Sequence, residues 1–294
     1  MEMEKLKIQH VHAHFATHPA VAGLIIKRLT GIPYSFTVHG SDLHVERRML
    51  CKKVEAASFA AAISFYNKGV MLRECGQDVF DKIHIVHCGV DTEFWRATRN
   101  ALARQSFHIV CVASFEEVKG HAVLMEACKR LARRGVNFTC HLVGEGPLKP
   151  VIEKQIVDHD LGKEVRLHGA LPRTGVRELL AEADVFVLAS VPTKEGKREG
   201  IPVVLMEAMS CGLPVVASDL SGIPELVLNR ESGILVPPAN VRDLAAALET
   251  LYKDPELRVN MGRTGRQRIV NEFSLERTAL NLLELFERNN QAPQ

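Results

Sequence analysis

Long apolar runs are missing from this sequence: none reaches the roughly 18 residues that a transmembrane helix needs. The first ten residues, MEMEKLKIQH, are charged and lack the apolar centre of a secretory signal peptide. Net charge is also scarce, only +2 over 294 residues, which gives no electrostatic reason to expect a nucleic acid partner. Together these absences favour a cytoplasmic protein.

Cysteine is sparse and irregularly spaced. Its seven occurrences are an odd number and never fall in a C-x-x-C pattern, so we expect reduced thiols that serve mostly as small core residues. G-x-S-x-G, P-loop and H-E-x-x-H patterns are absent too. Neither a fixed-period repeat nor a low-complexity tract is present.

The composition that remains is that of a globular protein, with 46% hydrophobic and 24% charged residues, which excludes disorder and a coiled coil. The length suits two domains. From Ser106 onward, apolar runs such as FHIVCVAS, NFTCHLVG, DVFVLAS and PVVAS alternate with helix-like segments. Continuous apolar runs are typical of parallel strands covered on both faces, so this alternation predicts a doubly wound α/β domain.

The first hundred residues show the same pattern with fewer strands, about four, in IQHVHAHF, YSFTVHG, FAAAIS and KIHIVHCG. One helix is expected to end at Gly31, and a long one to run from Ser41 or Asp42 through Lys53. Residues 91–106 have no strand pattern. We therefore predict a domain over residues 1–100 and a second, with C-terminal helices, over residues 101–294.

Two carboxylates stand eight positions apart in EGIPVVLME, at Glu199 and Glu207. Gly200 and Pro202 mark the turn from a loop into a helix, whose free N–H groups and dipole favour an anion. Glu207 shares a helical face with positions 200, 203 and 204, about 10 Å from the expected helix start. The pattern suits a nucleotide diphosphate sugar with its sugar at Glu199 and its ribose at Glu207. Solvated surface carboxylates are the alternative.

This segment resembles the E-x(7)-E signature of the retaining glycosyltransferases of family 4, the group 1 glycosyl transferases, which have the GT-B fold. The resemblance continues in order through TVHGSD, HCGVD, VGEGP and SGILVPP, and so covers nearly the whole chain. It implies two Rossmann-like domains that face each other across a cleft. It also implies a UDP-, GDP- or ADP-sugar as donor, with no cofactor and no bound metal. Bacterial exopolysaccharide and colanic-acid-type enzymes, which act on glycan or lipid-linked acceptors, are the most similar in pattern.

The resemblance also assigns residues. Glu199 meets the transferred sugar, His39 lies beside it, and Lys119 contacts the donor diphosphate; these are the predicted catalytic residues. Where the family usually has an arginine, five residues before the lysine, this chain has Ser114, and Lys194, Lys197 or Arg198 are candidate substitutes. The other predicted donor-binding residues are Gly200, Ile201, Pro202, Val203, Glu207, Ser114, Gly144, Gly146, His168, Gly169 and Leu171. A solvent-exposed lysine at 119, a strand-end histidine at 39 and a plain turn at 144–146 are the simpler explanations.

The same resemblance implies retention by front-face attack, in which the leaving diphosphate helps to deprotonate the acceptor hydroxyl. Similar enzymes begin with further strand, glycine-rich loop and helix units, so we expect the N-terminal domain to be incomplete. A second hypothesis follows: a non-catalytic or partner-dependent nucleotide-sugar-binding protein, one part of a split enzyme whose partner chain completes this domain. An epimerase is disfavoured by EGIPVVLME. The basic segment Glu46–Lys53 suggests peripheral contact with the inner membrane face, although a solvated helix is the simpler interpretation.

Two further patterns resemble metal sites. His10, His12 and His14 share one face of a strand, as zinc ligands can, but neither a cysteine nor a carboxylate cluster stands nearby. Asp158–Asp160 spells D-x-D, a manganese motif of a different glycosyltransferase fold, at the end of an amphipathic helix. We predict that neither binds a metal.

Overall fold

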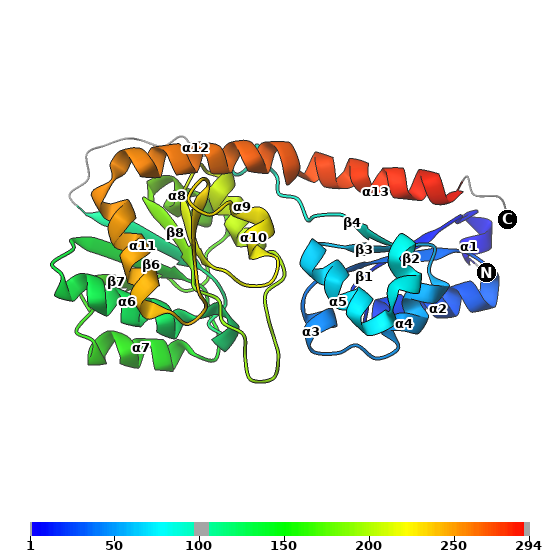
Figure 1. The fold of residues 1–294 in the computed structure, drawn as a ribbon, viewed down its shortest axis with the longest axis horizontal. Helices are drawn as coiled ribbons and strands as arrows, with labels where there is room; N and C mark the ends of the chain where they lie inside the picture. The colour runs from blue at the N-terminus through cyan, green and yellow to red at the C-terminus, as the bar shows by residue number, and fades with distance from the viewer. Residues whose placement is uncertain (1, 97–105, 291–294) are drawn as a thin grey trace.

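Two parallel β-sheets form the two halves of the molecule (Figure 1). The structure is a computed structural model, and it describes residues 2–96 and 106–290. The first sheet has the order β1-β2-β3-β4. Its strands are β1 (Val11–His14), β2 (Tyr34–Val38), β3 (Ala60–Ala62) and β4 (Ile83–Ile85). The four strands predicted for this half are confirmed.

Short helices accompany the first sheet. They are α1 (Glu2–Lys5), α2 (His18–Thr30), α3 (Ser41–His44), α4 (Leu50–Ala56), α5 (Phe65–Cys75) and the 3₁₀ helix η1 (Gln77–Lys82). Gly31 ends α2 in the left-handed conformation, as expected. The long helix predicted through Lys53 is wrong, because the chain leaves the helical path after α3. Met49 takes a left-handed φ of 57° before α4 begins.

The second sheet has the order β10-β9-β8-β5-β6-β7, with every pair parallel. Its strands are β5 (Phe107–Val112), β6 (Phe138–Val143), β7 (Val165–Leu167), β8 (Val185–Leu188), β9 (Val215–Ser218) and β10 (Gly233–Val236). This is the order of a doubly wound sheet, in which the direction of winding reverses between β5 and β8. Its apolar strands build the larger core of the molecule.

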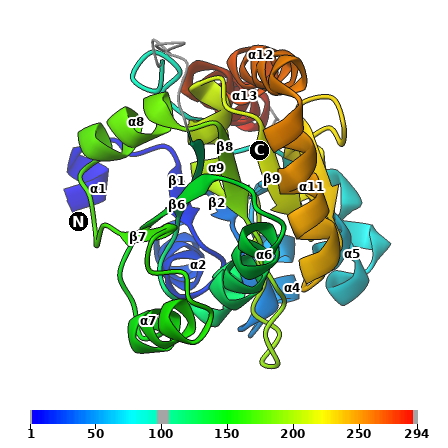
Figure 2. The ribbon, with the colours of Figure 1, turned by 90° about the vertical axis from the view of Figure 1, so that its left-hand side faces the viewer.

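Helices cover both faces of this sheet (Figure 2). One layer holds α6 (His121–Arg133), α7 (Lys149–Asp158) and α11 (Val241–Lys253), and the other holds α8 (Arg173–Glu182), α9 (Val203–Ser210) and α12 (Pro255–Glu272). The short elements η2 (Glu117–Lys119) and α10 (Ile223–Leu226) lie in loops. Within residues 2–96 and 106–290, no helix combines the length and hydrophobicity that a bilayer crossing requires.

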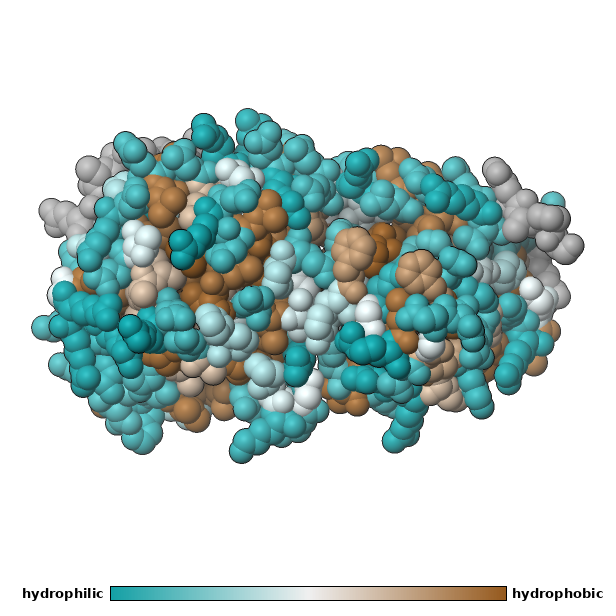
Figure 3. Space-filling model, viewed as in Figure 1, coloured by the Kyte–Doolittle hydropathy of each residue, from teal (hydrophilic) through white to brown (hydrophobic). Residues whose placement is uncertain are grey.

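The last helix, α13 (Leu275–Asn290), returns to the first half (Figure 1). Leu285 packs there in a small cluster with Phe59, Ala61 and Val86. The chain therefore passes between the halves twice, once before β5 and once between α12 and α13. The space-filling view shows the halves in contact at the middle of a largely hydrophilic face (Figure 3).

The expectation of reduced cysteines is wrong for two of the seven. Cys51 in α4 and Cys75 at the end of α5 form a disulfide, with their Cα atoms 5.0 Å apart. Their separation of 24 residues does not reveal that α4 and α5 pack side by side. The other five cysteines carry thiols.

Candidate functional site

A pocket of about 340 Å³ opens where the carboxyl ends of the two sheets face each other. One wall comes from loops after β2, β3 and β4, and the other from loops after β5 and β8 and from the start of α9. Doubly wound sheets bind ligands at this reversal point between two strands. The lining residues are His39, Gly40, Ile63, Cys88, Ser114, Glu116, Val118, Lys119, Lys197, Arg198, Glu199, Gly200, Ile201 and Val203.

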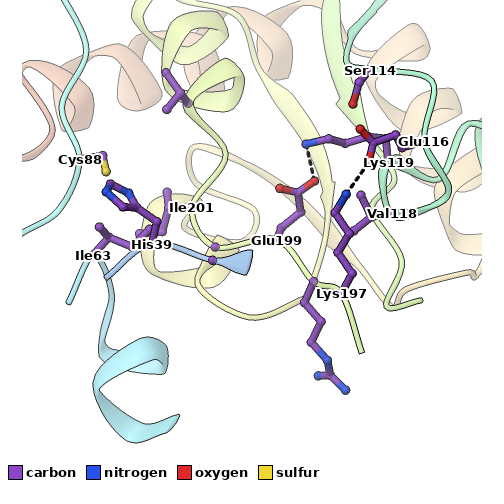
Figure 4. Close-up of a pocket in the computed structure, with 14 residues that line it drawn as sticks. His39, Ile63, Cys88, Ser114, Glu116, Val118, Lys119, Lys197, Glu199 and Ile201 are labelled. Atoms are coloured by element: carbon purple, nitrogen blue, oxygen red, sulfur yellow. Dashed lines mark hydrogen bonds and ion pairs between the residues drawn. The ribbon is translucent and has the colours of Figure 1, made fainter. Parts of the chain in front are cut away.

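Lys119 and Glu199 form an ion pair in this pocket, with Nζ 2.6 Å from Oε1 (Figure 4). Glu199 is only 9% exposed, and the hydroxyl of Ser190 donates to the same oxygen over 3.5 Å. Lys119 ends the 3₁₀ turn after β5, whereas Glu199 lies in the loop after β8. The pair therefore joins the two segments that flank the reversal point.

Gly120 allows this close approach. Its φ of +68° lies in the left-handed region, which glycine adopts without the strain of a side chain. A Cβ at this position would overlap the carbonyl oxygen of Ala189, directly after β8. The Lys-Gly dipeptide thus has a backbone explanation: only glycine lets the chain after Lys119 lie against β8.

A second ion pair stands beside the first. Lys197 Nζ contacts Glu116 Oε2, and this hydrogen bond is the main reason why the pKa of Glu116 lies below its ordinary value (Figure 4). Ser114, where an arginine is expected, lines the same wall. Of the three basic residues considered as substitutes, Lys197 and Arg198 line the pocket and Lys194 does not.

Helix α9 begins at the pocket. Pro202 occupies the position before it, and among the described residues no side chain caps its first N–H groups. The neighbours of Pro202 on either side, Ile201 and Val203, line the pocket. The helix dipole and the uncapped N–H groups favour an anion at this point.

Glu207 lies one turn into α9, not two as expected, because the helix begins only at Val203. Its distance along the helix is therefore about 6 Å rather than 10 Å. Burial raises the pKa of Glu207, while Arg173 acts in the opposite direction. Its carboxylate lies outside the pocket lining, and within the described residues it makes no hydrogen bond or ion pair.

His39 lines the opposite wall of the pocket. Its backbone N–H donates to the buried carboxylate of Asp42 at 3.1 Å, and its ring lies 3.2 Å from His14, measured between Nε2 and Nδ1. Burial lowers the pKa of His39, although Asp42 acts against this. Cys88 stands beside it with a pKa that burial raises to about 11 (Figure 4). At neutral pH this wall therefore offers a largely neutral imidazole and a neutral thiol.

Two glycines bring the walls together. A Cβ on Gly40 would lie 3.4 Å from the backbone nitrogen of Gly200, and a Cβ on Gly200 would lie 3.0 Å from Cδ1 of Ile63. A side chain at Gly200 would therefore crowd Ile63, whereas one at Gly40 would only reach ordinary van der Waals contact.

The remaining predicted residues gather at the ends of β6 and β7. Gly144 donates its N–H to the carbonyl of Gly169 at 2.9 Å, and His168 Nε2 lies 2.9 Å from Nδ1 of His141. Gly144 and Gly146 have φ values of +145° and +157°, and a Cβ on either would strike the backbone after β5. Leu171 packs against the core. These residues adjoin the pocket's sheet edge but do not line it.

The two metal-like patterns have other partners. His10 and His12 each contact the Ser35 hydroxyl at 2.7 Å, and His12 also contacts Thr37 at 2.9 Å. Asp158 pairs with Lys154 at 2.5 Å. Throughout the described part of the chain, no three or more His, Cys, Asp or Glu side chains are placed to hold a metal ion.

Sequence reasoning missed several lining residues, above all Glu116. The signal was available: Glu116 stands three positions before Lys119 and two positions after the end of a predicted strand. What the sequence does not reveal is its partner, because Lys197 lies 81 positions away.

Comparisons with known proteins identify the family of the chain. The model of the family described as Glycosyl transferases group 1 matches residues 95–268, and that of Glycosyltransferase Family 4 matches residues 1–94. The amylovoran biosynthesis glycosyltransferase AmsK of Erwinia amylovora is 36% identical over 208 residues, 71% of this chain and 51% of that protein. The chain thus spans about half the length of the curated relatives it matches.

Solved structures share the fold. Sucrose-phosphate synthase from Thermosynechococcus elongatus superposes with a TM-score of 0.86 at 21% identity, covering 99% of this chain and 76% of that one. HepE from Anabaena, in complex with UDP-glucose, gives 0.82 at 20% identity, covering 95% and 79%. The predicted GT-B fold, two Rossmann-like halves, is confirmed.

Proposed function

The chain belongs to the group 1 glycosyl transferases, and on this premise we propose that it moves a sugar from a nucleotide-sugar donor to a hydroxyl of a glycan or lipid-linked acceptor, with retention of configuration. The observation that carries the proposal is the Lys119–Glu199 pair beside the uncapped start of α9. A diphosphate needs this combination of a cation and free N–H groups, and a sugar needs a buried carboxylate as hydrogen-bond acceptor.

The leaving group is stabilised by charges already in place. The donor diphosphate lies at the N-terminus of α9 and takes Lys119 as a partner, so the charge that develops as the sugar leaves meets a fixed cation. Lys197 supplies a second positive charge from the same wall, in the role that Ser114 cannot fill. Because Lys119 and Lys197 pair with Glu199 and Glu116 before the donor binds, the diphosphate has to compete with these carboxylates.

Transfer then needs no protein nucleophile. The bond between the anomeric carbon and the diphosphate oxygen breaks, the acceptor oxygen attacks from the same face, and its proton passes to the leaving diphosphate. His39, held largely neutral by burial, is placed to hydrogen-bond the sugar at the opposite wall. Neither Cys88, with a pKa of about 11, nor a metal ion takes part in this scheme.

The nucleotide extends from the diphosphate in two directions. Its ribose reaches Glu207, whose otherwise unused carboxylate accepts two hydroxyl hydrogen bonds. Its base lies over the ends of β6 and β7, against the backbone of Gly144, Gly146 and His168–Leu171. UDP-glucose is the first donor to test, since HepE binds it, and exopolysaccharide synthesis is the proposed setting, since AmsK serves amylovoran biosynthesis.

A cytoplasmic location at the inner membrane face is part of the proposal. Of the basic residues in segment 46–53, Arg47, Arg48 and Lys52 are exposed, as contact with an anionic lipid surface requires. Arg47 pairs with Glu74, however, and Arg48 with Glu46. Lys53 is not available, because it is 2% exposed and donates to the carbonyl of Ala16.

A panel of UDP-, GDP- and ADP-sugars tests the function, with binding measured by calorimetry and turnover by donor hydrolysis and transfer. We expect one nucleotide series to bind and to turn over. If no member of the panel binds, the donor site is refuted.

The second candidate is a partner-dependent nucleotide-sugar-binding protein. Two observations favour it: Ser114 stands where an arginine is expected, and both lysines of the wall are already neutralised. Binding without turnover by the purified chain would select this candidate, together with turnover after addition of a partner chain.

A further inference from the structure

The turn that holds α10 carries a carboxylate that reaches across to the other half. Glu225 accepts hydrogen bonds from the backbone N–H groups of Phe65 at 2.7 Å and Tyr66 at 2.8 Å. These residues open α5, whose own cap, Ser64, accepts from the N–H of Asn67 at 3.0 Å. Residues of both halves therefore satisfy the first N–H groups of one helix.

Glu225 is held firmly in its own half. Arg268 donates to the backbone carbonyls of Glu225 at 2.8 Å and of Leu226 at 3.0 Å. From the first half, His87 adds a further contact between the halves, with its Nε2 3.5 Å from the carboxylate. Burial pushes the pKa of Glu225 upward, but the hydrogen bonds from His87 and the two N–H groups outweigh it, so the pKa lies below its ordinary value. A charged, anchored carboxylate thus sits at the positive end of α5.

The capped helix leads directly to the pocket. Asn67, in the first turn of α5, is fully buried and its side-chain amide donates to the backbone carbonyl of His39. Ile63, just before the cap, lines the pocket next to Gly200. Movement of the α5 N-terminus would therefore displace both His39 and Ile63.

The turn that holds α10 also contacts the loop after β8 that carries Glu199 to Ile201. A Cβ on Gly222 would lie 2.8 Å from Cγ1 of Ile201 and 3.1 Å from Cβ of Ser64. The α10 turn is thus wedged between the loop that carries Glu199 to Ile201 and the start of α5.

We propose that Glu225 is a positioning residue that caps α5 from the opposite half. It thereby holds His39 and Ile63 at the distance from the Lys119–Glu199 wall that sugar transfer requires. Its effect on catalysis rests on the proposed sugar transfer, whereas its effect on the arrangement of the halves does not.

The first experiment needs no ligand. Small-angle X-ray scattering compares the wild type with Glu225→Ala and with a matched control, Asp254→Ala. Asp254 also caps a helix through its carboxylate, accepting from the N–H of Leu257 at 2.9 Å, but entirely within one half. We expect a larger radius of gyration for Glu225→Ala alone. Identical scattering from all three proteins would overturn the proposal. If Glu225→Ala does not fold, Glu225→Leu, which keeps the bulk of the side chain but has no acceptor oxygen, carries the same comparison.

The second experiment separates positioning from binding, with UDP and UDP-glucose as probes. Glu225→Ala should lower the kcat of transfer roughly 10- to 100-fold, because a small displacement near the reacting atoms is costly. The Kd for UDP should stay unchanged, and Asp254→Ala should change neither. Equal kcat in Glu225→Ala and wild type, or a parallel loss of UDP affinity, would contradict the positioning role. If the wild type transfers no sugar, the proposed function fails, and scattering still decides the role of Glu225.

Discussion

The two walls of the pocket differ in kind. The wall from the second half carries five charged side chains: the paired Glu116, Lys119, Lys197 and Glu199, and in addition Arg198. The wall from the first half offers backbone, Ile63, a thiol and an imidazole whose pKa burial lowers. Under the proposed function, we therefore expect the charged diphosphate at the wall from the second half and the neutral hydroxyl acceptor at the wall from the first. We call the wall from the second half the charged wall and the wall from the first half the neutral wall. Variants that affect one wall and not the other test this division.

The largest effect, on the free energy of unfolding, is expected from Gly120→Ala, which disrupts the backbone next to Lys119 in the charged wall. A Cβ there would collide with the backbone at Ala189, so we expect a loss of several kcal/mol in the free energy of unfolding. Gly135→Ala is the matched control, because its φ of +72° is similar but nothing lies within 4 Å. It should cost only about 1 kcal/mol. Equal losses in urea unfolding would mean that the contact at Ala189 does not matter.

Lys119→Ala removes the central cation of the charged wall. Turnover should fall roughly 10²- to 10³-fold, the usual cost of losing one group that stabilises a leaving charge. Lys154→Ala, which breaks an exposed pair with Asp158, serves as control. Normal kcat in the Lys119 variant would exclude its role at the diphosphate.

Acid should lower the free energy of unfolding of the second half through His121, the buried residue after Gly120. Burial lowers its pKa from 6.5 to about 4, with Lys119 contributing. Between these pH values the unfolded chain takes up a proton that the folded chain does not, so stability falls as pH falls. His121 alone accounts for on the order of 3 kcal/mol by pH 4.

His121→Leu should flatten this dependence of the unfolding free energy, and His18→Leu, at an exposed histidine of α2, should leave it intact. Parallel pH curves for His121→Leu and wild type would disprove the assignment.

His39→Ala affects the neutral wall alone. We expect transfer to drop roughly 10- to 100-fold while nucleotide affinity stays the same, because in the proposed function His39 contacts only the sugar. Kinetics and calorimetry on one preparation check both values. A weaker nucleotide affinity in this variant would break the division between the walls.

Glu207→Ala should have the smallest effect, a loss of roughly tenfold in nucleotide affinity, about 1.4 kcal/mol, as expected for lost hydrogen bonds to a charged acceptor. Burial raises the pKa of Glu207, with only Arg173 acting against it, so the variant should also be as stable as the wild type or more so. Unchanged affinity would remove Glu207 from the ribose site.

The two walls also differ in how much of their structure could be predicted from the sequence. The charged wall depends on short stretches, EGIPVVLME and Lys119-Gly120, in which each residue type has a local reason, and the β-α alternation predicts the sheet around them. The contacts between segments that lie far apart in the sequence were not predictable. Glu225 meets Phe65 from 160 positions away, and Cys51 pairs with Cys75 only because two helices pack together. In the first half, the exposed residues 45–49 pack too little to hold one continuous helix, and helix propensity alone misled there.

A structure with a bound nucleotide-sugar tests the division most directly, through the distances from its diphosphate oxygens. Hydrogen bonds to Lys119 Nζ and to the first N–H groups of α9, with His39 touching only the sugar, are the predicted result. A diphosphate bound at the His39 wall, or anywhere away from α9, would contradict it.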